Sequence, residues 1–259
     1  MATTLRISSE ELALALSLSE HQSLAHDFLV SSFGSGLNQD EIRGKLTAAS
    51  HTLLSQRLIS IAADTTISLS PLLQEVVGVM TAATRTIRLS RSSASEQRML
   101  SYHSTSKGMY EHWIENGVTH VITLVEKQGI IEACPIFFEL TMYVQTAEAS
   151  GQIPNTLIRH ALRLSNPAEA ERLLSAVDVS DTIRKQISED LTQTVSIGDV
   201  LDIRYTENGA PVADQGLMLI FGRTRFWLLR PTKQDDELWL TILPGTGAAL
   251  QDEVQKLIA

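Results

Sequence analysis

The chain has 259 residues, 43% of them hydrophobic and 20% charged, which is the profile of a soluble globular protein long enough for one large or two ordinary domains. Its formal net charge of −9 disfavours a nucleic-acid partner, because nonspecific affinity for a phosphate backbone comes mainly from cationic side chains. We therefore expect its partners to be proteins.

Helices are predicted for most of the first ninety residues. Ser8 or Ser9 can cap a first helix that contains Leu12, and a second helix is expected around residues 24–33. The leucines of the first segment recur at every second position, which is also the period of a strand.

A winged-helix order follows. Asn38 and Glu41 have the spacing of a capping box, in which each side chain satisfies a free amide of the first turn. The predicted elements are a short helix to Leu46, a turn at 47–49, a helix over 50–58, and strands over 59–61 and 66–69. These elements make up the winged-helix-like segment that we expect in the first half of the chain.

The winged-helix order allows two interpretations. A helix that reads a DNA groove normally presents several cationic or amide side chains, whereas residues 50–58 offer only His51, Gln56 and Arg57. We therefore predict a segment used for packing or protein contact. A winged-helix transcriptional regulator is the alternative.

The chain becomes rich in predicted strands after residue 85. Residues 86–91 alternate polar and apolar side chains, as a half-buried strand does. Asn116 and Gly117 form the dipeptide that most readily takes the positive φ angles of a tight hairpin. Further strands are expected over 98–103, 109–114 and 118–125, followed by a helix over 130–144.

A second set of elements repeats this plan. Helices are expected over 156–164, 167–177 and 180–192, strands over 200–205, 217–221, 225–229 and 238–243, and a last helix over 247–258. Residues 147–154 contain Ser150, Gly151 and Pro154 and are the expected linker. We therefore predict two α/β units, at 1–146 and 147–259.

The second half also repeats the first in its pattern of apolar residues. The stretch Arg98–Phe138 aligns without a gap on Leu217–Leu257, shifted by 119 positions, and Tyr102 falls on Phe221. A shift near half the chain length is what internal duplication predicts. The expected fold class is α+β, with two pseudo-symmetric units that each contain an antiparallel sheet and helices.

Motifs of catalysis and metal binding are scarce. Ser104 and Lys107 match an S-x-x-K pattern, but they fall in a predicted loop and lack the partner motifs of serine acyl-enzymes. His21 and His26 are five positions apart, and no H-E-x-x-H motif or cysteine pair provides metal-ligand spacing. We therefore expect no enzyme, no cofactor, no metal site and no catalytic residue. An unfamiliar enzyme would rest on Ser104 and Lys107 alone.

Adjacent aromatic residues are the candidate partner-binding residues. Side chains of neighbouring strand residues point to opposite faces, so either Phe226 or Trp227 is exposed unless helices cover both faces of the sheet. Phe137 and Phe138 form a second adjacent pair. Burial is the ordinary outcome for such residues, but an uncovered aromatic face is a natural protein-binding surface.

The chain also carries signals of its compartment. Its one cysteine, Cys134, has no second cysteine for an internal disulfide, which suits a reducing environment. The first residues lack a basic region followed by an apolar run, and no stretch of about 18 uncharged apolar residues is present. We expect a cytoplasmic protein without a membrane span.

Several segments together resemble a known family. These are Ser9–Leu12, His51–Ile59, Leu69–Leu73 and Ile87–Leu89. Their order and spacing over residues 8–140 resemble the EspG chaperones of type VII (ESX) secretion systems. The resemblance implies a pseudo-symmetric α/β fold and a cytosolic chaperone that binds a helical secretion substrate and covers its apolar tip. The leading hypothesis is therefore a noncatalytic, EspG-like chaperone or adaptor.

Overall fold

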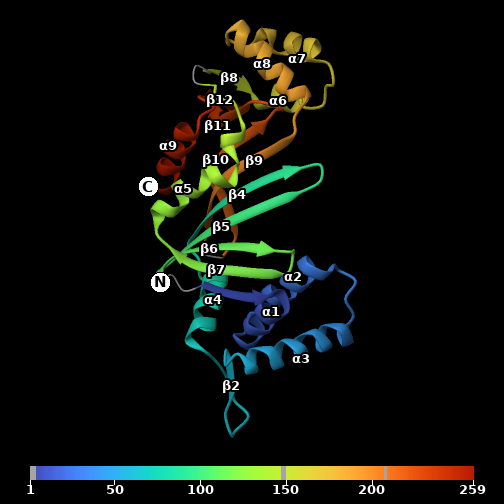
Figure 1. The fold of residues 1–259 in the computed structure, drawn as a ribbon, viewed down its shortest axis with the longest axis vertical. Helices are drawn as coiled ribbons and strands as arrows, with labels where there is room; N and C mark the ends of the chain where they lie inside the picture. Colours follow the sequence, from blue (N-terminus) through green and yellow to red (C-terminus); the bar gives the residue numbers. More distant parts are fainter. Residues whose placement is uncertain (1–3, 147–149, 207–208) are drawn as a thin grey trace. The chain divides into compact units, whose positions relative to one another are not determined.

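A computed structural model describes residues 4–146, 150–206 and 209–259 (Figure 1). The chain forms two compact units. Unit 1 comprises Met1–Arg85 and Leu100–Val125, and unit 2 comprises Thr86–Met99 and Glu126–Ala259. The division into two domains at 1–146 and 147–259 remains a prediction.

The sheet of unit 1 is antiparallel, with strand order β1-β7-β6-β5. Its strands are β1 (Thr4–Ser8), β5 (Gln97–Thr105, of which Leu100 onward lies in unit 1), β6 (Gly108–Glu115) and β7 (Thr119–Val125). Asn116 and Gly117 connect β6 to β7 with φ angles of 51° and 75°, which confirms the predicted tight hairpin. Strand β1 was not expected, because it is only five residues long and precedes the first helix directly.

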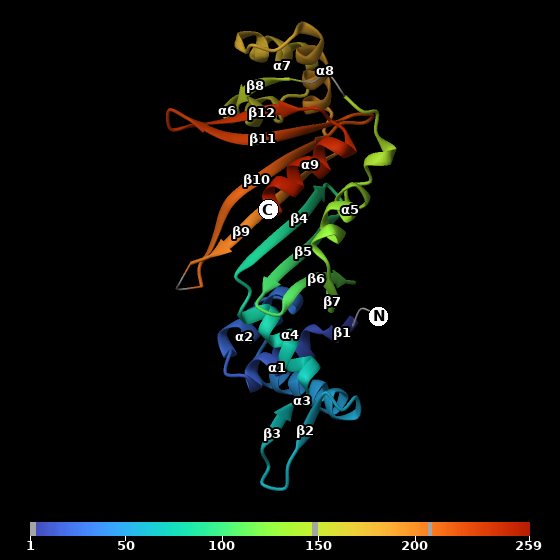
Figure 2. The same ribbon diagram turned by 90° about the vertical axis from the view of Figure 1, so that its left-hand side faces the viewer.

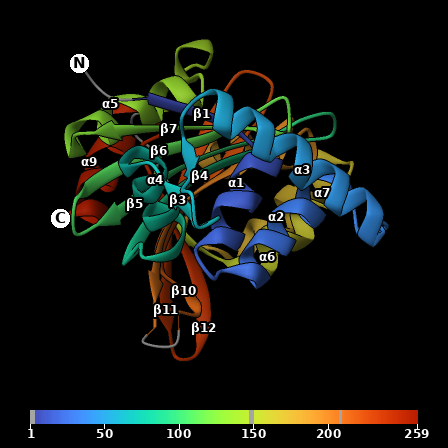
Figure 3. The same cartoon turned by 90° about the horizontal axis from the view of Figure 1, so that it is seen from below.

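Unit 1 also contains α1 (Ser9–Leu18), α2 (Gln22–Phe33), α3 (Gln39–Ser55) and α4 (Pro71–Thr81), and Figure 3 shows α1, α2 and α3. Ser8 caps α1 in a complete capping box with Glu11, and Asn38 caps α3 in the predicted box with Glu41. The leucines of α1 therefore belong to a helix. Apolar residues of these helices and of the sheet, among them Leu12, Leu16, Leu53 and Ile122, form one buried core.

The prediction of a turn at residues 47–49 is wrong. Helix α3 continues through these residues as one helix of 17 residues. Thr47, Ala48 and Ala49 include neither glycine nor proline, and Thr47 donates its hydroxyl proton to the Arg43 carbonyl inside the helix at 2.8 Å. The predicted small hairpin is confirmed as β2 (Ile59–Ile61) and β3 (Ile67–Leu69). The hairpin therefore follows one long helix, α3, rather than the two short helices predicted from the sequence.

The sheet of unit 2 has strand order β4-β9-β10-β11-β12-β8. Its strands are β4 (Arg85–Ser93, in unit 2 from Thr86), β8 (Gly151–Pro154), β9 (Ser196–Tyr205), β10 (Pro211–Phe221), β11 (Phe226–Gln234) and β12 (Glu237–Leu243). Gly151–Pro154, expected in a linker, instead pairs with β12, with Ile153 opposite Leu240. Residues 147–149 of the predicted linker lie outside the described residues.

Helices of unit 2 pack on both faces of this sheet. The helical elements are α5 (Lys127–Phe137), η1 (Leu140–Met142), α6 (Asn155–Ala161), α7 (Pro167–Leu173), η2 (Leu174–Ala176), α8 (Asp181–Thr192) and α9 (Gly247–Ile258). One core joins α6, α7 and α8 to sheet residues that include Trp227 and Leu229. Phe138, just after α5, stacks on Phe221 with ring centroids 6.0 Å apart, and helices α5 and α9 pack against each other.

The two runs that are 119 positions apart form the same elements in the same order. The first contains β5, β6, β7 and α5, and the second contains β10, β11, β12 and α9. The α+β class with antiparallel sheets is confirmed, whereas descent from a duplication remains a prediction. Within the described residues, the helices are all too short or too polar to cross a membrane.

Candidate functional site

The four aromatic candidates lie mostly inside unit 2. Phe226, Trp227 and Phe138 are fully buried, and Phe137 is partly buried. Phe226 and Trp227 point to opposite faces of β11, as expected of neighbours in a strand, but helices cover both faces. The partner-binding role of these residues remains a prediction. The three buried side chains could contribute to partner binding only by supporting residues nearer the surface.

Trp227 belongs to a buried polar cluster centred on Asp190 of α8. Its indole N–H donates to Asp190 Oδ2 at 2.9 Å, and Arg225 Nε donates to the same oxygen at 2.9 Å. Arg225 also pairs with Glu189 at 3.2 Å. A Cβ at Gly222 would collide with the Asp190 carboxylate, so glycine allows this close approach. The cluster fixes the turn between β10 and β11 against α8.

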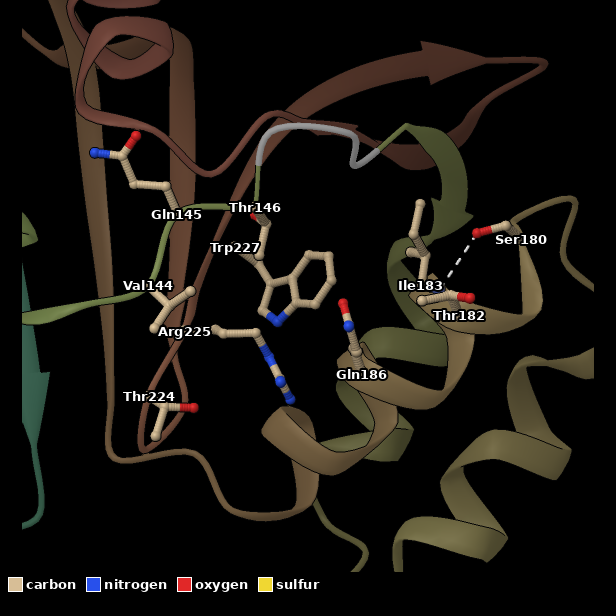
Figure 4. A pocket seen from close by; sticks show the side chains of 10 residues that line it. All are labelled: Val144, Gln145, Thr146, Ser180, Thr182, Ile183, Gln186, Thr224, Arg225 and Trp227. Atoms are coloured by element: carbon tan, nitrogen blue, oxygen red, sulfur yellow. Dashed lines mark hydrogen bonds between the residues drawn. The ribbon is translucent and has the colours of Figure 1, made fainter.

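A pocket of about 580 Å³ with a mixed polar and apolar lining opens beside this cluster. Figure 4 shows Trp227, Arg225 and Gln186 around the hollow, with Ser180, which caps α8, and Thr182 on one side and Val144 and Thr146 on another. Among the described residues, the lining offers hydroxyl, amide and guanidinium groups together with the apolar surfaces of Val144, Ile183 and Trp227. It is therefore less apolar than a surface that binds only apolar side chains.

An apolar cleft lies elsewhere in unit 2, where the sheet divides. Strands β10 and β11 pair only from Met218 opposite Leu229 to Phe221 opposite Phe226. The β9–β10 ladder continues to Pro211, and the β11–β12 ladder continues to Gln234. The two hairpins therefore diverge, as Figure 2 shows. We call the cleft between hairpins β9–β10 and β11–β12 the fork.

The fork has a volume of about 690 Å³ and a largely apolar lining. Its larger apolar residues are Leu201, Leu217, Met218, Pro231, Leu238 and Leu257. Its charged residues are Asp199, Asp214, Arg230, Lys233, Glu253 and Lys256. Lys256 pairs with Glu253, whose side chain is only 10% exposed, whereas Lys233 pairs with the exposed Asp236. An exposed pair stabilises a protein by less than about 1 kcal/mol, so Lys233 remains available to a partner's acidic groups.

The strand edges that border the fork are poorly suited to adding another strand. Pro231 lacks the N–H that a ladder requires, and the β9–β10 register shifts between Ala213 and Gln215. Lys233 adds a charge on β11, and these three features are common protections of sheet edges. The fork is therefore suited to apolar side chains that project from a partner, as they do from one face of a helix.

The comparison with family models finds a match over most of the chain. A model described as "Uncharacterised protein YfjC" matches residues 28–246. The chain belongs to the YfjC family. The comparison with curated proteins finds no match.

This YfjC-family chain is similar in structure to EspG5, the Mycobacterium tuberculosis type VII secretion system chaperone solved in complex with the PE25–PPE41 dimer. The TM-score is 0.71 at 12% sequence identity, and the match covers 99% of this chain and 96% of that chain. At such low identity the likeness shows the fold alone. The EspG-like fold expected from the sequence is confirmed.

The S-x-x-K residues of the YfjC-family chain do not lie on a helix. Ser104 is near the end of β5 and Lys107 is in the following turn, so the lysine is not one helical turn after the serine. Within the ranges that the structure describes, there is no group of histidine, cysteine and acidic side chains suited to a metal ion. His21 and His26 are exposed.

Proposed function

We propose that this YfjC-family protein is a noncatalytic binding protein that acts in the cytoplasm as a secretion chaperone or adaptor for a helical protein client. The observation that carries the proposal is the likeness to the EspG5 chaperone over nearly the whole length of both chains. Similar folds can serve different functions, so a functional proposal also needs a binding site on this chain.

The fork is the proposed docking site for the client. Its lining is largely apolar, whereas that of the pocket beside Trp227 is about equally polar and apolar. A client helix would insert apolar side chains between the hairpins and place an acidic residue near Lys233. Leu238 is 42% exposed at this site, and burying such a side chain in a complex is favourable.

Affinity purification from the native cells, followed by mass spectrometry, tests the function. A protein client with predicted helices should co-purify in stoichiometric amount and survive nuclease treatment. The absence of any co-purifying protein, under conditions that recover a known complex of similar abundance, would contradict the proposal. Partners lost with nuclease would point to nucleic-acid binding instead.

A further inference from the structure

Three histidines form a hydrogen-bonded row inside unit 1. His103, His112 and His120 come from the adjacent strands β5, β6 and β7. His103 Nε2 lies 3.3 Å from His112 Nδ1, and His112 Nε2 lies 2.9 Å from His120 Nδ1. The rings of His112 and His120 stack with their centroids 5.2 Å apart. We call these three residues the histidine row.

The row connects the sheet to α1 and α2. His120 Nε2 is 3.1 Å from Ser9 Oγ of α1, and Ser32 of α2 donates its hydroxyl proton to the same oxygen at 2.7 Å. Ser9 in turn donates to the Val118 carbonyl at 3.2 Å. Phe28 of α2 also packs edge-on against the His120 ring, with centroids 5.3 Å apart. These contacts hold both helices on the sheet.

One arrangement of protons satisfies this network. Since Ser9 donates to Val118, it accepts from His120 Nε2–H, so a neutral His120 accepts at Nδ1 from His112 Nε2–H. A neutral His112 then accepts at Nδ1 from His103. A single extra proton can be accommodated if the neutral rings change tautomer, so that each contact keeps one donor and one acceptor. A second charged ring leaves one contact with two facing donors and no acceptor. The row therefore breaks when more than one of its rings is charged.

Burial also opposes charging. His112 is 9% exposed and His120 is 1% exposed. Burial lowers the pKa of His120 to about 4, and burial, followed by the charges of the neighbouring histidines, lowers the pKa of His112 to about 3. Burial likewise lowers the pKa of His103 to about 4. The neutral row is therefore stable at pH 7.

The charged groups on the surrounding elements have partners of their own. Glu11 of α1 accepts from the Ser8 amide, and Glu10 pairs with Lys45 of α3. Glu75 of α4 accepts from the Tyr110 hydroxyl of β6, and Arg6 of β1 pairs with Glu115 of β6. Glu111 of β6 accepts from the Tyr102 hydroxyl of β5. His26 and Asp27 of α2 are exposed.

We propose that the histidine row is a pH-sensitive latch, which holds α1 and α2 on the sheet of unit 1 at neutral pH and releases them in acid. An opened state exposes the imidazoles, which then take up protons below their ordinary pKa of about 6.5. The closed state does not take up these protons until its own lower pKa values are reached. The latch is therefore fully effective above about pH 6.5 and weakens as the pH falls toward about 4.

Hydrogen exchange of the full-length protein measures the latch directly. The exchange rates of the α2 amides, corrected for intrinsic rates, give the equilibrium constant for opening. Below pH 6 this constant should rise by up to about a thousandfold for each unit by which the pH falls, or tenfold for each of the three exposed histidines. Replacing one histidine, as in His112→Gln or His120→Gln, should reduce this to about a hundredfold. The control is His26→Gln, on the exposed side of α2, which should keep the full dependence.

Equal pH dependence in the wild type and both row variants would overturn the proposal. Where a variant does not fold, the wild-type protein provides a second measurement, namely nuclear magnetic resonance titration of its histidine side chains. The latch requires His112 and His120 to remain neutral down to about pH 5. Titration of either ring near pH 6.5 in the folded protein would refute it. Neither result depends on the presence of a client.

Discussion

Asp190 and Trp227 are joined by a buried hydrogen bond of 2.9 Å between the carboxylate of α8 and the indole N–H of β11. The same carboxylate oxygen also accepts from Arg225. A buried carboxylate is stable only when it is paired and hydrogen-bonded, and both conditions are met. This contact therefore links the β10–β11 turn, where the two arms of the fork join, to the helices on the other side of the sheet.

We predict that Asp190→Ala lowers the free energy of unfolding by about 3–5 kcal/mol, because it leaves Arg225 and the Trp227 indole without their buried acceptor. Urea denaturation at pH 7 measures this loss. Asp236→Asn is a suitable control, since Asp236 forms an ion pair with Lys233 but its side chain is 92% exposed. The control should change stability by less than about 1 kcal/mol. Similar effects of the two substitutions would contradict the role assigned to Asp190.

Gly222→Ala should destabilise the protein by about 1–3 kcal/mol, because its new methyl group would collide with the Asp190 carboxylate. Gly44→Ala should have the opposite sign. Gly44 lies on the exposed surface of α3 with open space around it, so alanine there should add about 0.5–1 kcal/mol through helix propensity. Thermal unfolding of the two variants tests both signs. A neutral Gly222→Ala would show that Asp190 can move aside.

Ala48→Pro tests the continuity of α3. Proline in a helix interior removes a hydrogen bond and clashes with the preceding turn, so we expect a loss of about 3 kcal/mol or more. If residues 47–49 formed the turn of a winged helix, proline would be tolerated there. Ala48→Ser at the same exposed position should have an effect below about 1 kcal/mol. Helical circular dichroism and urea denaturation distinguish these outcomes.

Glu139 provides a prediction of pH dependence. Its carboxylate accepts from Arg98 at 2.8 Å and from Arg91 at 2.9 Å, and the hydrogen bond from Arg98 is the largest cause that lowers its pKa below the usual 4.5. A carboxyl group with a lowered folded-state pKa stabilises the protein above its unfolded pKa, and this contribution is lost as the pH falls through the folded value.

We therefore expect Glu139→Gln to reduce stability at pH 7 by less than about 1 kcal/mol, because the carboxylate is partly exposed and its ion pairs are screened by solvent. The difference from the wild type should shrink as the pH falls below 4.5. Urea midpoints at several pH values measure this change. A difference that is constant from pH 7 to pH 3 would show that the charge of Glu139 contributes nothing.

Much of the fold could be predicted from local signals in the sequence. The predicted cap at Ser8 or Ser9, the capping box at Asn38, the Asn116–Gly117 turn and the alternation along β4 each correspond to an observed element. These signals are local because a cap or a turn satisfies its own backbone groups. Strands β1 and β8 were missed, since their few residues are fixed by pairing with the distant strands β7 and β12.

The sites were harder to predict, because each depends on contacts between distant residues. The fork arises from the limited pairing of β10 with β11, and its nearest signs in the sequence are Pro231 and Lys233, which are residue types common at protected strand edges. The histidine row joins residues from three strands, which have no shared spacing in the sequence. The aromatic pairs were visible, but their burial depends on helices that cover both faces of the sheet.

A paired affinity experiment tests whether a protein client binds in the fork. Leu238→Asp places a charge in the fork, and Leu124→Asp makes the same change at a leucine of nearly equal exposure in unit 1, 41% compared with 42%. We predict that Leu238→Asp loses the client that the wild type recovers from native cells, while Leu124→Asp retains it. Full recovery of the client by a folded Leu238→Asp variant would show that the client does not bind in the fork.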